Sequence, residues 1–164
     1  MHAHDAAHQD GRHDFDFLFG HWRIHNERLV KRLQGCTEWQ TFDAEQEVRP
    51  VLGGIANIDR FSATFPDGHP IEGLTLRIFN PRTRLWSLYW VDDRGCELQP
   101  PVVGRFTAGR GEFVGDDELG GQPIRVIFLW TDITPTSARW EQAFSTDDGR
   151  TWETNWRMQM TKAA

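Results

Sequence analysis

The chain has 164 residues, of which 38% are hydrophobic and 26% charged, and its 18 basic and 24 acidic side chains give a formal net charge of −6. This length predicts one domain, and the 8 Trp and 11 Phe exclude a disordered or collagen-like chain. No apolar run reaches the ~18 residues that a membrane-spanning helix needs. The negative charge also argues against a nucleic-acid partner.

The first 14 residues, MHAHDAAHQDGRHD, contain no apolar core and predict a disordered leader rather than a targeting signal. A flexible tail offers its histidines no fixed geometry and no supporting hydrogen bonds, so we expect no metal site there. The two cysteines, Cys36 and Cys96, lie outside any Cys-x-x-Cys motif. We expect reduced thiols and a cytoplasmic protein.

Ordered structure is expected from residue 15. The apolar stretch FDFLFG over residues 15–20 predicts a short helical plug that caps a core. Alternation begins at once afterwards, with Trp22, Ile24 and Asn26 on one face, and period 2 is the signal of a β-strand. Further strands are expected at residues 38–49, 54–61, 71–79 and 85–91.

The second half of the chain continues the same pattern. A hairpin is expected over residues 102–107 and 111–115, followed by an acidic, glycine-rich loop from Asp116 to Gly121. Strands over residues 123–131, 137–144 and 151–160 complete the series. Turn signals every 8–12 residues and the lack of a helical stripe predict an all-β, antiparallel, up-and-down barrel of about eight to ten strands over residues 15–164.

Three segments carry a resemblance to a known family. Gly20-His21-Trp22 has the Gly-x-Trp form that opens the first strand of lipocalins and the wider calycin group. FDFLFGHW, GLTLRIFNPRTRLWSLYWVDD and ARWEQAFSTDDGRTWETNW follow one another in the order found in a lipocalin-like family of small, mostly bacterial proteins, described as a domain of unknown function. The resemblance spans about residues 15–161 and implies a lipocalin-like barrel, but no reaction and no catalytic residues.

Tryptophan is the most informative residue type, because large flat side chains can line a pocket for an apolar or aromatic molecule or simply fill the barrel. The tryptophans expected to line a pocket are Trp86, Trp90, Trp140 and Trp156. One or two polar groups would orient the ligand, and the candidates are Gln142, Asn57 and Arg77. The alternation leaves open which face points inward in residues 54–61 and 71–79.

We expect no cofactor and no structured metal site. His21 and His25 share one strand face but lie about 13 Å apart, too far to bind one metal ion. In the haem-binding branch of the calycins the axial histidine comes from late in the chain, whereas no histidine follows His69 here. Acid–base catalysis would need a titrating group in the cavity, and the candidates are Glu141, Asp59 and His25.

The leading hypothesis is therefore a barrel that binds a small, largely apolar or aromatic molecule inside its cavity. The first alternative is a cofactor-free enzyme of isomerase, cyclase or hydratase type that uses the same cavity. The second is a solid barrel that acts as an interaction module. The sequence leaves a homodimer possible and predicts no nucleic-acid or membrane partner.

Overall fold

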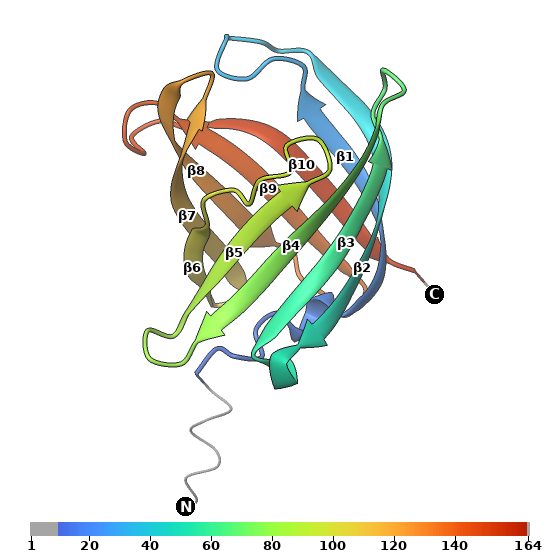
Figure 1. Ribbon diagram of the computed structural model, residues 1–164, viewed down its shortest axis with the longest axis vertical. Helices are drawn as coiled ribbons and strands as arrows, with labels where there is room; N and C mark the ends of the chain where they lie inside the picture. The colour runs from blue at the N-terminus through green and yellow to red at the C-terminus, as the bar shows by residue number, and fades with distance from the viewer. Residues whose placement is uncertain (1–9, 164) are drawn as a thin grey trace, which may run out of the picture.

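Ten antiparallel strands follow one another along the chain and close into a barrel (Figure 1). The structure is a computed structural model that describes residues 10–163, so residues 1–9 of the predicted leader lie outside the described residues. The strands are β1 (Gly20–Leu29), β2 (Trp39–Val51), β3 (Ala56–Thr64), β4 (Pro70–Asn80), β5 (Leu85–Asp92), β6 (Val102–Thr107), β7 (Arg110–Leu119), β8 (Gln122–Thr131), β9 (Ser137–Ser145) and β10 (Glu153–Lys162). Each strand pairs with the next, and β1 pairs with β10, so the predicted antiparallel barrel is confirmed, with ten strands.

Period-2 alternation places one face of each strand in the interior. In β1 the predicted inward residues Trp22, Ile24 and Asn26 are all at most 2% exposed. In β4 the inward face holds Thr75, Arg77 and Phe79, whereas the leucines of that strand point outward. A closed barrel has no unpaired edge, which removes the row of free backbone groups that an open sheet would present.

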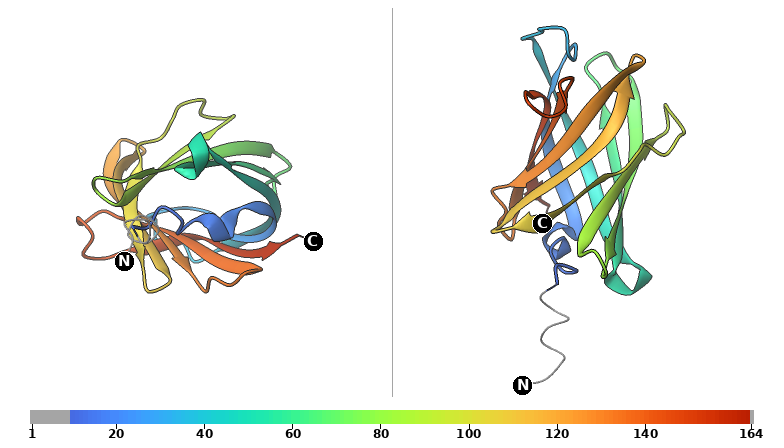
Figure 2. Two further views of the ribbon diagram at one scale, coloured as in Figure 1. Left: turned by 90° about the horizontal axis from the view of Figure 1, so that it is seen from below. Right: turned by 90° about the vertical axis from the view of Figure 1, so that its left-hand side faces the viewer.

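The N-terminal segment differs from the predicted helical plug. Asp16–Leu18 form a single 3-10 turn (η1), which lies across the lower end of the barrel in Figure 2. Phe15 and Leu18 are both fully buried. Their separation of three residues matches the three residues per turn of a 3-10 helix, which puts both side chains on one side. The indole N–H of Trp22 donates to the Leu18 carbonyl at 2.8 Å and fixes the turn against β1.

The predicted acidic loop over Asp116–Gly121 is also wrong in part. Residues up to Leu119 belong to β7 and pair with β8, which begins at Gln122. Only Gly120 and Gly121 form the turn, and both have positive φ (57° and 81°). A two-residue hairpin turn with two positive φ angles matches the twist of the flanking strands, and glycine adopts it without steric cost.

The two ends of the barrel differ. The N-terminal turn occupies the lower end, whereas β1 ends at the upper end (Figure 1). The upper end carries the connections over residues 30–38, 93–101 and 146–152. A second 3-10 turn (η2, Leu52–Gly54) joins β2 to β3. Among residues 10–163 there is no helix with the length and apolar character to cross a membrane.

Candidate functional site

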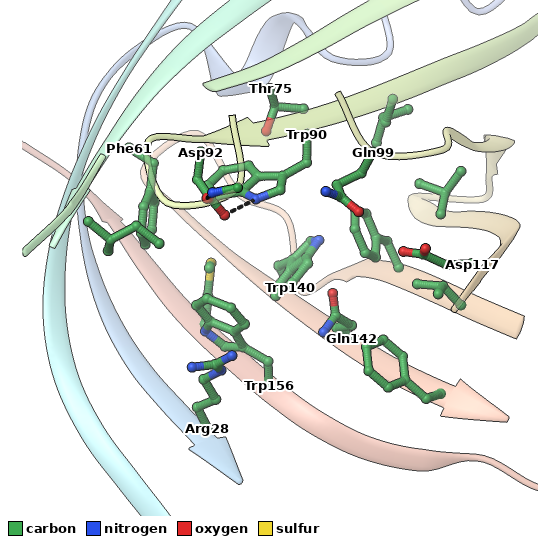
Figure 3. A pocket seen from close by; sticks show the side chains of 18 of the residues that line it. Arg28, Phe61, Thr75, Trp90, Asp92, Gln99, Asp117, Trp140, Gln142 and Trp156 are labelled. Atoms are coloured by element: carbon green, nitrogen blue, oxygen red, sulfur yellow. Dashed lines mark hydrogen bonds between the residues drawn. The ribbon is translucent and has the colours of Figure 1, made fainter. Parts of the chain in front are cut away.

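A cavity of about 430 Å³ lies inside the barrel, and Figure 3 shows side chains that line it. Its wall is built from inward-facing residues of most strands, together with residues of the upper connections. Volumes of 300–1,000 Å³ are typical of sites for small molecules. The barrel is therefore hollow in its upper part and filled with side chains in its lower part.

Tryptophan rings form much of the wall. Trp140 packs edge to face against Trp156, with ring centroids 6.1 Å apart, and against Phe128 at 5.0 Å. On the opposite wall Trp90 packs edge to face against Phe61 at 5.9 Å. Edge-to-face packing is the favoured arrangement of aromatic pairs, and it gives each ring a fixed orientation at the cavity.

The position of Trp90 depends on a glycine on the neighbouring strand. A Cβ atom at Gly73 of β4 would lie 2.0 Å from the Trp90 ring. The ring therefore lies directly over the β4 backbone, where only glycine leaves room. The Trp90 indole N–H also donates to Asp92 Oδ2 at 3.1 Å, so both ends of the ring are held.

A second set of hydrogen bonds holds the tryptophan of β10. The Trp156 indole N–H donates to Asn26 Oδ1 at 3.0 Å, and the Asn26 amide donates to the Phe42 carbonyl at 3.2 Å. Nearby, Gln142 Nε2 donates to Asn155 Oδ1 at 2.8 Å. Asn155 reaches the interior because the register between β10 and β9 shifts between Thr154 and Trp156. This β-bulge adds one residue to the strand and breaks the alternation.

A buried ion pair lies at the floor of the cavity, where Arg77 lines the wall and Asp59 lies behind it. Arg77 donates to Asp59 Oδ2 at 2.5 Å and to Asn57 Oδ1 at 3.0 Å. Asp59 Oδ1 accepts the Thr75 backbone N–H at 3.1 Å. The side chains of Arg77 and Asp59 are 3% and 0% exposed. The pair is formally neutral, and the Arg77 guanidinium lies 5.5 Å from the centre of the Phe15 ring, which ties the floor to the N-terminal turn.

Arginines gather at the upper end of the cavity. The Arg28 guanidinium lies 4.8 Å from the Trp156 ring centre and 5.3 Å from that of Phe65. Arg94 also lies over Phe65, at 5.6 Å, and Arg32 lies over Phe144 at 5.8 Å. Burial, with the like charges of Arg32 and Arg94, lowers the pKa of Arg28 to about 10. Arg28 therefore remains charged at neutral pH.

Four buried polar atoms of the wall have no hydrogen-bond partner in the described part of the chain. They are Arg28 Nε, Gln46 Oε1, Arg77 Nε and Trp130 Nε1. Leaving a buried donor or acceptor unpaired costs about 1–3 kcal/mol. Three of these atoms are donors, and the fourth, Gln46 Oε1, is an acceptor.

The structure brings together five of the seven residues proposed for ligand binding. The residues on the cavity wall are Trp90, Trp140, Gln142, Trp156 and Arg77. Trp86 lies below the floor, where its indole N–H donates to the Gly11 carbonyl at 3.0 Å and its ring packs against Phe15. Asn57 lies behind Arg77 and contacts it directly.

The three acid–base candidates lie apart. Glu141 is on the outer side of β9, paired with Arg139 at 2.8 Å and with Arg157 at 3.5 Å. His25 is exposed on the outer side of β1, 3.2 Å from Asp43. Asp59 alone is interior, and there it is held by Arg77. None of the three is part of the cavity wall.

Sequence reasoning missed several residues of the wall. Arg28 continues the alternation of Trp22, Ile24 and Asn26 by one more step, so the signal for its inward position was present. Asp92 is likewise two residues beyond Trp90. Asn155 lies outside the wall and accepts a hydrogen bond from Gln142. It had no such signal, because the periodicity does not reveal the bulge that turns it inward.

Comparisons with known proteins support the fold. No protein-family model matches the chain, and no curated protein matches it. Among solved structures, the chain is similar to an S-type phycobiliprotein lyase, CPES, from Guillardia theta, with a TM-score of 0.61, 10% identity, and coverage of 96% of this chain and 97% of that one. It is also similar to a redesigned beta barrel, with a TM-score of 0.50, 12% identity, and coverage of 91% and 94%. At these identities the likeness shows the fold alone.

Proposed function

We propose that the protein binds a small, largely apolar or aromatic molecule inside the barrel. The observation that carries this proposal is the cavity of about 430 Å³, whose wall includes Trp90, Trp140 and Trp156. Wall residues also contain buried polar atoms that have no hydrogen-bond partner among the described residues. Rigid aromatic side chains give contact area at low cost in conformational entropy. A barrel that served only as an interaction module would have no need of such an interior.

The hydrogen bonds of the wall support the same proposal. Trp90 and Trp156 are each fixed by an indole N–H donating to a side-chain oxygen, so their rings need not reorganise when a ligand binds. A preformed wall lowers the entropic cost of binding. The fold of the solved structures fits this proposal, since closed barrels of this size can hold one small ligand.

Binding of N-phenyl-1-naphthylamine, an uncharged aromatic probe, tests the proposal. We expect saturable 1:1 binding, seen as probe fluorescence and as quenching of tryptophan emission. Met158 lines the cavity, so Met158→Trp should fill part of it and weaken probe binding by about tenfold or more, equivalent to about 1.4 kcal/mol.

The matched control is Gln159→Trp, one residue further along β10. Neighbouring residues of a strand point to opposite faces, and Gln159 is exposed on the outside. It should leave the probe affinity within about twofold of the original, well under the 1.4 kcal/mol of a tenfold change. Absence of saturable binding, or equal weakening by both substitutions in folded protein, would contradict binding in the cavity.

A further inference from the structure

The upper end of the cavity contains a partly buried cation, Arg28. Arg28 is the last inward-facing residue of β1, and its guanidinium lies near the rings of both Trp156 and Phe65. Within residues 10–163, no carboxylate lies within ion-pair distance of its guanidinium, and its Nε is buried without a partner. Burying an arginine without a counter-charge is unfavourable unless something else compensates.

The acidic residues nearest the opening are already engaged or lie on another side. Asp92 accepts hydrogen bonds from the Trp90 indole and from the backbone N–H groups of Arg94 and Gly95. Burial opposes ionisation of Asp92, but these hydrogen bonds outweigh it and lower its pKa. Asp116 pairs with Arg125 at 3.0 Å. Asp117 lies across the cavity from Arg28, beside Gln99 (Figure 3).

Two like charges act on Arg28, and only one opposite charge, that of Asp92, which forms no ion pair with it, partly offsets them. Arg32 and Arg94 both line the cavity, and both lower the pKa of Arg28 through repulsion. An anion placed among the three guanidinium groups would relieve this repulsion and supply the missing counter-charge. The planar guanidinium fork binds carboxylate, sulfonate and phosphate oxygens in a bidentate manner.

We propose that the ligand is an amphipathic anion, whose aromatic or apolar body lies among Trp90, Trp140 and Trp156 and whose acid group binds Arg28, flanked by Arg32 and Arg94. This inference rests on the proposed function, because it assigns the ligand class for the same cavity. The apolar wall selects the body of the molecule, and the unpaired arginine selects its charge and its orientation.

Two probes with one ring framework test the proposal. 1-Anilinonaphthalene-8-sulfonate is N-phenyl-1-naphthylamine with an added sulfonate, so the difference in affinity reports the acid group. We expect the affinity for the sulfonate to be at least about tenfold higher than that for the neutral probe, as measured by competition titration. Added NaCl should weaken binding of the sulfonate and leave the affinity of the neutral probe nearly unchanged.

Arg28→Met keeps an unbranched stem and removes the charge. It should lower the affinity for the sulfonate about tenfold, and it should lower the affinity for the neutral probe clearly less. The control is Arg23→Met, which makes the same charge change on the outer side of β1. Arg28→Lys, which keeps the charge and loses the fork, should lie between the original protein and Arg28→Met.

The outcomes separate the two proposals. If neither probe binds, the proposed function fails. If the neutral probe binds and the sulfonate gains nothing, or if Arg28→Met and Arg23→Met behave alike, the anion site is wrong and the apolar cavity stands. The comparison of the two probes on the original protein needs no variant, so it decides the question even if Arg28→Met fails to fold.

Discussion

Replacing Arg77 with leucine is expected to lower the free energy of unfolding by about 3–5 kcal/mol, because it leaves the Asp59 carboxylate buried without its partner. The Asp59 side chain is 0% exposed and accepts its Arg77 hydrogen bond at 2.5 Å, so solvent water is excluded from this contact. The substitution also removes the hydrogen bond that Asn57 Oδ1 accepts from Arg77 at 3.0 Å. Urea denaturation at pH 7 measures the loss directly.

The barrel supplies a matched control for this prediction. Arg60 and Glu72 also join β3 to β4, at 2.8 Å, but their side chains are 68% and 50% exposed. Arg60→Leu should lower the free energy of unfolding far less than Arg77→Leu, because exposed ion pairs contribute little to stability. The double variant Asp59→Leu with Arg77→Leu should recover much of the loss of Arg77→Leu, because no buried charge remains unpaired. Equal losses at Arg60 and Arg77 would show that the interior pair is not what holds these strands.

Replacing Phe15 with alanine is expected to lower the free energy of unfolding by about 3–5 kcal/mol, the usual range for a fully buried phenylalanine. The Phe15 ring is 0% exposed and contacts Trp86 and Phe106, each at a centroid distance of 4.9 Å. Its removal leaves a void between the N-terminal turn and the lower strands. Thermal or urea denaturation measures the change, and near-ultraviolet circular dichroism should show altered tryptophan packing.

Phe17→Ala makes the same chemical change in the same turn. Phe17 is only half-buried, although it also contacts Phe106 at 6.0 Å and Trp130 at 5.7 Å. Phe17→Ala should therefore lower the free energy of unfolding clearly less than Phe15→Ala does, because the Phe17 side chain buries less apolar surface. A larger cost for Phe17→Ala than for Phe15→Ala would contradict the packing described for the lower end.

The strand pattern was predictable because alternation is strong where one face is uniformly apolar. Trp22, Ile24 and Asn26 in β1 show this, and the antiparallel order followed from the short turns. In residues 71–79 the same reasoning gave no answer. Leu74 points outward and Arg77 inward, since Asp59 on the neighbouring strand pairs the charge of Arg77. An ion pair between two strands cannot be predicted from the periodicity of either strand alone.

The candidate site was predictable to a similar extent. Trp90, Trp140 and Trp156 line the cavity, as expected from their strand faces, whereas Trp86 sits below the floor because the N-terminal turn fills that level of the barrel. How far a terminal segment reaches into a barrel is a property of tertiary packing. The bulge that turns Asn155 inward belongs to the same class, because it depends on the register of β10 against β9.

The indole N–H resonances of the eight tryptophans offer the most direct test of ligand binding inside the barrel. A ¹H–¹⁵N spectrum, assigned by single Trp→Phe substitutions, would be recorded during titration with 1-anilinonaphthalene-8-sulfonate. Binding in the cavity should shift the four indoles of its wall, those of Trp90, Trp130, Trp140 and Trp156. The indole of Trp152, which is 38% exposed outside the cavity, should stay in place. Shifts confined to Trp152 and other indoles outside the wall, or no shifts at saturating probe, would contradict an internal binding site.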